Sequence, residues 1–331
     1  MDVLVLDGRE IARLLPVAEC IPVMEAALRA LAQGEALLPL RTVLWNPERS
    51  GALAAMPAYL GTPRAFAVKV ITVFPGNTHV DPHQGAVLLF DAGDGRLLAI
   101  LDATEVTAIR TAAVSGVATQ ALAVEGARTL ALIGSSTQAR THLAAVRAVR
   151  PIEEVRVFSR SHEKARAFAA RESERHGFEV RVCGSAEEAV RGAQVVCTVT
   201  SSRTPVVAGE WLSPGAHVNA VGASIAAARE LDAAAVARAR LYVDRRESAL
   251  AEAGDFLQAR AEGAVDDAHI VGELGELLLG RLEGRRDARE ITLFKSVGIA
   301  VEDLAAAHEI HRRAQASGAG ARVSLGGHPP G

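Results

Sequence analysis

The chain has few aromatic residues, few cysteines and no long apolar run, and each shortage excludes a class of protein. Aromatic residues make up only 4% of its 331 residues, so Ala, Val and Leu must fill the core. Cys20, Cys183 and Cys197 lie far apart in apolar segments. This excludes a disulfide framework and a metal site, and predicts reduced core thiols in a cytoplasmic protein. No stretch of about 18 consecutive apolar residues occurs, so we expect no membrane span.

Positive charge is also not in excess. The formal net charge is −3, which leaves no basic footprint for nucleic acid. The first ten residues, MDVLVLDGRE, have no basic region before the apolar run and do not match a signal peptide. The histidines lack zinc-site spacing, so we expect no bound metal. With 49% hydrophobic and 23% charged residues, the chain is predicted to be globular, with room for two domains.

The first third of the chain carries strand signals behind two helices. Val3–Leu6 is a predicted strand, and Asp7 is placed to cap a helix over Gly8–Leu15. Pro16 is expected at the first position of a longer helix that stops at Gly34. The segment DAGDG between two strands predicts a hairpin, and therefore an antiparallel sheet. The expected strands are Arg41–Leu44, Leu53–Tyr59, Ala65–Phe74, Ala86–Phe90 and Leu97–Leu101, and a helix follows over Thr104–Ala123.

From Thr129 the pattern alternates between strand and helix, which predicts a parallel sheet with helices on both faces. A last helix is expected from Lys295 to about Ala314, and Ser317–Gly331 is rich in Gly and Pro and is expected to be disordered. The predicted strands lie near 130–133, 155–158, 179–182, 194–199, 217–221, 240–243 and 291–294. The predicted helices lie at 137–148, 161–176, 185–191, 231–238 and 271–280.

The turn after the first of these strands has the features of a phosphate site. A strand that turns through Gly134 into a helix directs backbone N–H groups and the positive helix end at whatever lies above it. The dinucleotide fingerprint is G-x-G-x-x-G/A, and here its middle Gly is Ser136, whose hydroxyl can donate to a phosphate instead. The alternative is an ordinary strand–helix turn.

Three cations lie in segments that otherwise look buried. They are Arg41 in LLPLRTVLW, Lys69 in AFAVKVITVF and Arg110 in VTAIRTAAVSG. An unpaired buried cation is very costly, and no carboxylate is adjacent in sequence. One explanation is that all three converge on an anionic ligand. The alternative is that each pairs with a distant Asp or Glu, or reaches the surface.

Taken together, these segments resemble the ornithine cyclodeaminase/μ-crystallin family over about Leu38 to His308. The matching pieces are PLRTVL (39–44), AAMPAY (54–59), VKVITVFPGN (68–77), HQGAVLLFDA (83–92), TAIRTAAVSGVAT (107–119), TLALIGSSTQA (129–139), VNAVGAS (218–224), REL (229–231) and ITLFKSVGIAVEDLAAA (291–307).

The resemblance implies an α/β fold, with a Rossmann doubly wound parallel sheet and an α+β, mainly antiparallel, domain for substrate binding and homodimer formation. The implied limits are 1–118 with 305–331 for the substrate domain and 119–304 for the NAD(P)-binding domain. It implies that Arg41, Lys69 and Arg110 hold the substrate carboxylate. We further expect Met56 and Ser224 to meet the substrate, and Lys69 and Ser224 to be catalytic, with Ser224 orienting the imine nitrogen or a water. The implied cofactor residues are Thr111, Gly134, Ser135, Ser136, Thr137, Gln138, Ala139, Val199, Thr200, Ser201, Val221, Ser296, Val297 and Gly298.

Two departures separate the chain from ornithine cyclodeaminases. Those enzymes carry a Glu where this chain has Ala54, and a catalytic Asp where it has Ser224. The sequence is more similar to the ketimine reductase branch, which reduces pyrroline-2-carboxylate or piperideine-2-carboxylate to proline or pipecolate. The alternatives are an ornithine cyclodeaminase-type or alanine dehydrogenase-type enzyme, and a non-catalytic, NADP-binding crystallin-like protein.

The end of the second Rossmann strand indicates which cofactor is preferred. NAD enzymes usually place an acid there for the ribose 2′-hydroxyl. Here Ser159 and Arg160 follow the strand, so no acid repels a 2′-phosphate and Arg160 can pair with one. We therefore expect NADP(H) to be preferred, with NAD(H) possible; the alternative is that Arg160 is a solvated loop residue.

Overall fold

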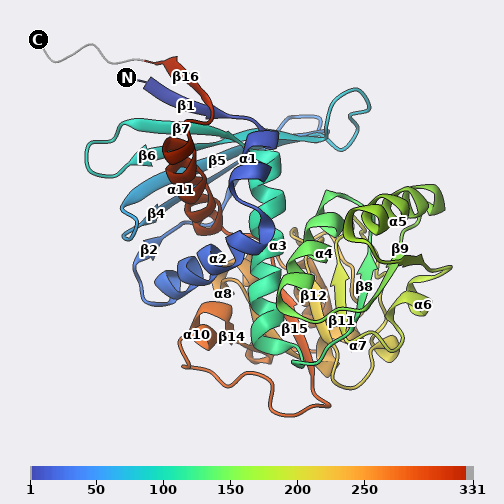
Figure 1. The fold of residues 1–331 in the computed structure, drawn as a ribbon. Coiled ribbons are helices and arrows are strands. Elements are labelled where there is room, and N and C mark those ends of the chain that lie inside the picture. Colours follow the sequence, from blue (N-terminus) through green and yellow to red (C-terminus); the bar gives the residue numbers. More distant parts are fainter. Residues whose placement is uncertain (1, 326–331) are drawn as a thin grey trace, which may run out of the picture. The chain divides into compact units, whose positions relative to one another are not determined.

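The computed structural model describes residues 2–325, which form two compact units, each with its own eight-stranded sheet. The first unit ends at Arg110 and resumes at Ile299, and the second is Thr111–Gly298. Neighbouring strands are mostly antiparallel in the first sheet and all parallel in the second, which confirms the α/β plus α+β fold class (Figure 1). The domain limits expected from the sequence remain a prediction. None of the helices in residues 2–325 is long and apolar enough to cross a membrane.

The first sheet has the strand order β16-β1-β7-β6-β5-β4-β2, with β3 paired to β4. DAGDG joins β6 to β7 as a hairpin, as predicted. The strands are β1 (Asp2–Leu6), β2 (Ala36–Leu37), β3 (Thr42–Trp45), β4 (Ala52–Leu60), β5 (Ala65–Val73), β6 (His83–Asp91), β7 (Leu97–Asp102) and β16 (Ala321–Ser324).

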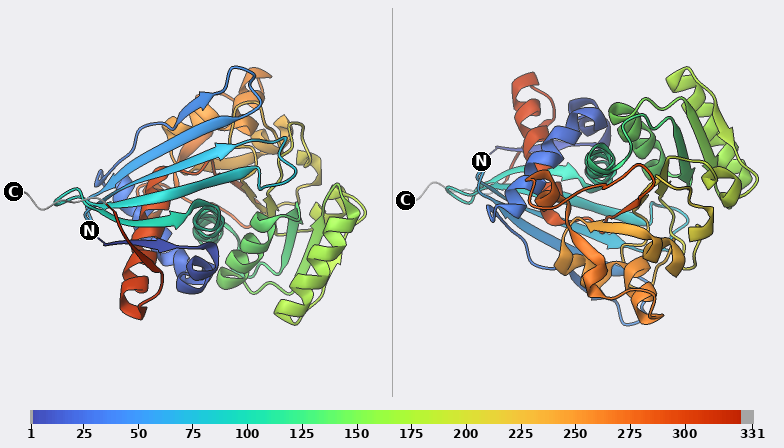
Figure 2. Two further views of the ribbon diagram at one scale, coloured as in Figure 1. Left: turned by 90° about the horizontal axis from the view of Figure 1, so that it is seen from above. Right: turned by 90° about the horizontal axis from the view of Figure 1, so that it is seen from below.

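The first helix of this unit begins at a capping residue that the sequence predicts. Asp7 forms a capping box with Glu10 at the start of α1 (Gly8–Leu14). Pro16 precedes α2 (Val17–Ala32) rather than opening it, and α3 (Ala103–Leu122) continues into the second unit. The last helix, α11 (Ala300–Ser317), packs on β4, β5, β6 and α2. Figure 2 shows α11, in red, beside the blue α2.

The second sheet has the order β10-β9-β8-β11-β12-β15-β13-β14. The chain leaves β8 in one direction through β9 and β10, then returns to β8's other side with β11, so the sheet is doubly wound about β8. Its strands are β8 (Thr129–Ile133), β9 (Glu154–Phe158), β10 (Val180–Val182), β11 (Val195–Thr198), β12 (His217–Ala220), β13 (Ala239–Val243), β14 (Ile270–Glu273) and β15 (Ile291–Lys295).

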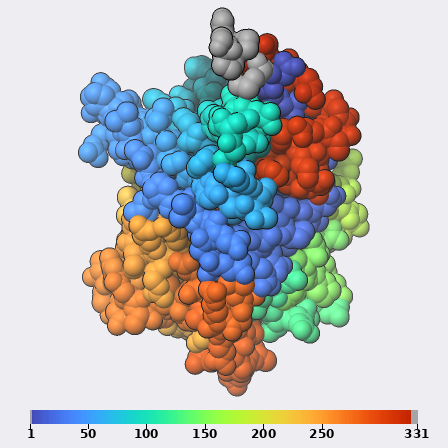
Figure 3. Space-filling view, turned by 90° about the vertical axis from the view of Figure 1, so that its left-hand side faces the viewer, coloured from blue at the N-terminus to red at the C-terminus, as the bar shows by residue number. Residues whose placement is uncertain are grey.

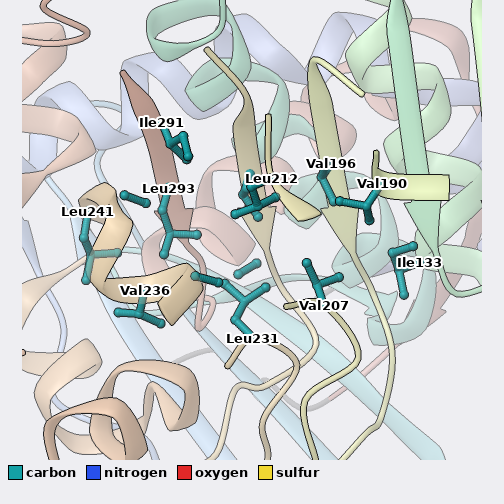
Figure 4. Close-up of a cluster of buried hydrophobic side chains, with 14 of the residues drawn as sticks. Ile133, Val190, Val196, Val207, Leu212, Leu231, Val236, Leu241, Ile291 and Leu293 are labelled. Atoms are coloured by element: carbon teal, nitrogen blue, oxygen red, sulfur yellow. The ribbon is translucent and has the colours of Figure 1, made fainter. Parts of the chain in front are cut away.

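Small and branched side chains fill the core of this unit, as the shortage of aromatics predicts. Figure 4 shows valines, leucines and isoleucines of one cluster meeting beside the sheet. Cys20, Cys183 and Cys197 are buried and free, as expected. The helices are α4 (Thr137–Val149), α5 (His162–His176), α6 (Ala186–Val190), α7 (Ala233–Arg238), α8 (Arg246–Glu252), α9 (Gly254–Ala261) and α10 (Leu274–Leu278).

Several expectations about elements were wrong. Lys295 ends strand β15, and the last helix begins only at Ala300, because Gly298 turns the chain with a φ of 75°. The predicted helix 271–280 is strand β14 followed by the short α10. Residues 321–324 pair with β1 instead of being disordered, and residues 326–331 of that tail lie outside the described residues.

Candidate active site

Gly134 lies at the position where the chain leaves β8. Ligands bind open α/β sheets at the carboxyl ends of the strands, at the point where strand order reverses. That point lies between β8 and β11. Gly134 has a φ of 121°, and a Cβ on it would lie 2.9 Å from the carbonyl oxygen of Val199. Both the backbone conformation and the close approach of the next strand therefore require glycine here.

The first turn of α4 is open to an anion. Its N-cap residue, Ser136, makes no side-chain capping bond, and Ser136 and Thr137 are exposed. Because the first-turn N–H groups of a helix have no intrahelical partner, they bind phosphate readily. Among residues 2–325, Thr111 Oγ1 and Gln138 Oε1 are buried without a hydrogen-bond partner. A hydroxyl and a carboxamide can bond the phosphate and ribose oxygens of a dinucleotide, so these residues fit such a cofactor.

Ser159 and Arg160 follow β9, the strand beside β8. Arg160 is exposed, while the next residue, Ser161, caps α5 through the backbone N of Lys164. The loop therefore leaves the guanidinium at the carboxyl end of the sheet, and no Asp or Glu occupies the end of β9.

The loops after β11, β12 and β15 carry the remaining predicted cofactor residues, and buried acids hold two of these loops. Both backbone N–H groups of Val297 and Gly298 donate to Asp244, each at 2.7 Å. The backbone N and the hydroxyl of Thr200 both donate to Glu230. Thr200 therefore turns its donors inward. Sequence analysis gave no role to Asp244 or Glu230, because their partners lie far away along the chain. Val199 and Val221 are buried, and Ser201 is exposed.

In the first unit, Lys69 and Arg110 both bind the carboxylate of Asp303, which was not among the predicted site residues. Lys69 Nζ lies 2.8 Å from Asp303 Oδ2, and Arg110 Nε donates to Asp303 Oδ1 at 2.9 Å. Arg110 Nη1 donates to Glu302 Oε2 at 2.5 Å. All four side chains are buried. Two acids from the first turn of α11 thus balance the two cations, so their burial is no longer evidence for an external anion. Their roles toward substrate stay a prediction.

The environment of Lys69 brings its titration close to neutrality. Burial lowers the pKa of Lys69 to about 8; Asp303 opposes this shift, and the charges of Arg110 and Arg41 add to it. Thr107 accepts a hydrogen bond from Lys69 at 3.3 Å. Burial raises the pKa of Asp303, but Arg110 and Lys69 outweigh that effect and hold it below its ordinary value. Lys69 is thus a buried cation that can lose its proton under mild conditions.

The other predicted substrate residues differ in how far they are buried. Met56 is buried on β4 and lies opposite Lys69 in the strand register. Arg41 is half-buried just before β3, but its segment is not buried as expected, because Thr42–Trp45 are all exposed. Ser224 is half-buried in the loop after β12 of the second unit.

Comparison with known proteins gives the family. The model of the ornithine cyclodeaminase/mu-crystallin family matches residues 1–318. The chain belongs to this family. It is 43% identical to ketimine reductase mu-crystallin of Mus musculus over 88% of this chain and 90% of that protein.

Two solved structures share the fold over nearly the whole chain. One is Thermococcus litoralis Δ1-pyrroline-2-carboxylate reductase in complex with NADH and L-proline, with a TM-score of 0.94, 39% identity and coverage of 97% of this chain and 100% of that one. The other is an archaeal alanine dehydrogenase dimer with bound NAD, with a TM-score of 0.92, 32% identity and coverage of 98% and 100%. Within the ornithine cyclodeaminase/mu-crystallin family, the chain is more similar to ketimine reductases than to true ornithine cyclodeaminases.

Proposed function

We propose that the protein is an NAD(P)H-dependent reductase of cyclic ketimines that carry a carboxylate on the imine carbon. Its products are cyclic amino acids such as proline and pipecolate. The observation that carries the proposal is Lys69, a buried amine with a pKa of about 8, in a chain similar to two reductases of such substrates.

Each residue has a role in this reaction. The reduced nicotinamide, when bound, supplies the hydride that the C=N carbon accepts. Arg41, Lys69 and Arg110 hold the substrate carboxylate, and a fixed substrate gains much of its rate from positioning alone. Lys69 is protonated at neutral pH, so its charge stabilises the carboxylate and its proton can move to the imine nitrogen. Ser224 orients that nitrogen or a water, and Met56 packs beside Lys69.

The direct test is cofactor oxidation by the purified protein with pyrroline-2-carboxylate and with piperideine-2-carboxylate. Turnover of either one supports the proposal. A dehydrogenase or cyclodeaminase would instead turn over alanine, ornithine or lysine with the oxidised cofactor. Tight cofactor binding without any turnover would identify a non-catalytic, crystallin-like binding protein.

The pH dependence of the reaction should follow Lys69. Because the pKa of Lys69 is lowered to about 8, the cation is present below that pH and is lost as the pH rises through it. We expect kcat/KM to fall by about tenfold per pH unit in the alkaline range. In Lys69→Arg, whose guanidinium does not titrate there, this decrease should vanish. If kcat/KM of Lys69→Arg still fell in the alkaline range, the group that titrates there would belong to the substrate and not to Lys69.

Arg160 is proposed to set a preference for NADP(H). A charge-assisted hydrogen bond contributes about 1.5–3 kcal/mol, so Arg160→Ala should weaken NADPH binding roughly tenfold to a hundredfold and leave NADH nearly unchanged. The matched control is Arg166→Ala, since Arg166 is also exposed but lies within α5. An equal loss for both cofactors would contradict this role for Arg160.

The protein is proposed to form a homodimer through the outer face of the first sheet. The other face is covered by α11, whereas Leu44, Leu53 and Phe66 are exposed on β3, β4 and β5 and, by the strand register, point away from it. Figure 3 shows the blue segments that include these strands at the surface. Exposed apolar patches of this kind mark protein–protein interfaces, and the alanine dehydrogenase relative is a dimer.

The dimer proposal predicts that charge on this face separates the subunits. Leu44→Glu should shift the protein to monomer in analytical ultracentrifugation, because it would bury an unpaired carboxylate at the interface. Val323→Glu is the control, since Val323 is also exposed but lies on β16 at the opposite edge of the sheet. A monomeric wild type would exclude the dimer.

A reducing, cytoplasmic location is proposed as well, in keeping with three buried thiols that form no disulfide.

A further inference from the structure

Glu230 is a fully buried carboxylate with four donors around it. Its Oε1 accepts hydrogen bonds from the backbone N of Thr200 at 2.6 Å and from the hydroxyl of Thr200 at 2.7 Å. Its Oε2 accepts from the hydroxyl of Thr198 at 2.9 Å and from the backbone N of Gly222 at 2.7 Å. Each oxygen therefore has two donors. Burial and the nearby Asp255 raise the pKa of Glu230, while a backbone N–H on each carboxylate oxygen, from Thr200 and from Gly222, favours the ionised form.

These bonds join two loops at the carboxyl end of the parallel sheet. Thr198 ends β11 and pairs in register with Ala220, which ends β12. The loops that follow approach each other closely, because a Cβ on Gly222 would lie 1.9 Å from the carbonyl oxygen of Thr200. Glu230 bonds both loops where they meet, next to Val199, whose carbonyl abuts Gly134.

Glu230 is itself held in place by a second buried acid. Asp255 accepts hydrogen bonds from the backbone N of Glu230 at 2.7 Å and of Leu231 at 2.8 Å. Asp255 also pairs with Lys295 at 3.1 Å, and Lys295 donates to the carbonyl of Ala220 at 3.1 Å. Buried groups from β15, β12 and α9 thus fix the Glu230 carboxylate from behind.

We propose that Glu230 is the positioning residue for the nicotinamide end of the cofactor site. Glu230 does not touch the cofactor; it positions the nicotinamide by setting the spacing of the loops at 199–202 and 221–224. The inference rests on the proposed function, in which these loops line the nicotinamide. The adenosine end is assigned to the Gly134 turn and to Ser159–Arg160, which Glu230 does not contact.

This division gives a test that compares the whole cofactor with a fragment. Glu230→Gln keeps the shape, but in either orientation its amide nitrogen faces a backbone N–H, of Thr200 or of Gly222, that cannot accept a hydrogen bond. The dissociation constant of NADPH should rise roughly tenfold or more, whereas that of 2′-phospho-ADP-ribose, which lacks nicotinamide, should change less than about twofold. Both are measured by calorimetry on the apoprotein. Thr198→Val, which removes one donor and keeps the shape of the side chain, should act in the same direction with a smaller effect.

The control is a buried acid of the same unit that does not contact these loops. Glu172 is fully buried in α5, where Arg171 and Arg175 pair with it. Glu172→Gln should lower the melting temperature and leave both dissociation constants unchanged. Equal losses for NADPH and the fragment in Glu230→Gln and Thr198→Val, or no loss in either variant, would overturn the inference. A wild type that binds neither ligand would instead refute the proposed function.

Discussion

Replacing Lys69 by Met is expected to lower kcat/KM for a cyclic ketimine roughly a thousandfold. The substitution removes the ammonium that carries both positive charge and a mobile proton, and keeps an unbranched chain of similar length on β5. Cofactor affinity should not change, because the residues assigned to the cofactor lie in the other unit. Steady-state kinetics with each ketimine and a cofactor titration provide the measurements.

A matched double variant separates this chemical loss from a loss of folding. Lys69→Met leaves Asp303 with one cation, and breaking a buried pair costs about 3–5 kcal/mol. In Lys69→Met combined with Asp303→Asn the buried charges balance again, because Arg110 still pairs with Glu302. We expect the double variant to regain most of the free energy of unfolding but not the activity. Near-normal turnover by Lys69→Met, or recovery of activity in the double variant, would show that Lys69 has no catalytic role.

Gly134→Ala is expected to weaken cofactor binding strongly, raising the dissociation constant by about a hundredfold or more. A φ of 121° is open almost only to glycine, and the added methyl would lie 2.9 Å from Val199 O. To relieve this contact the turn must move away from β11, and its N–H groups then miss the phosphates. Titration of the apoprotein with NADPH measures the effect.

Gly177→Ala is the control for backbone strain alone. Gly177 ends α5 with a φ of 69°, and a Cβ there meets nothing within 4 Å. This variant should lose stability by about 1 kcal/mol and bind cofactor normally. If both glycine variants bound cofactor equally well, the close approach of Val199 would not matter for the site.

Local signals in the sequence were sufficient to predict much of the fold. The alternation after Thr129, the Asp7 cap and the DAGDG hairpin each act within a few residues, so each is readable without tertiary contacts. The limits of the last helix were predicted wrongly, since ITLFKSVGIAVEDL is mostly apolar and only Gly298 marks the loop inside it. β16 was missed because its partner β1 lies at the other end of the chain.

The candidate site was predictable only in part, for the same reason. Lys69 and Arg110 stood out because a charge in an apolar strand or helix needs a partner. The partner itself, Asp303, is 193 residues from Arg110, and nothing in VEDL distinguishes it from a surface acid. Glu230 and Asp244 bind backbone N–H groups of other loops, and no sequence pattern records such a contact.

The separation between Lys69 and Asp303 has a consequence for biosynthesis. As the polypeptide leaves the ribosome, residues 2–110 emerge well before α11, so Lys69 of the first sheet and Arg110 of α3 lack their α11 counter-ions for most of translation. In a nascent chain stalled before Ala300, the first sheet should therefore stay accessible to protease. Once α11 is synthesised and packs on the sheet, the sheet should become protected. Unit 2 has no such delay, because its strands and helices are contiguous in sequence.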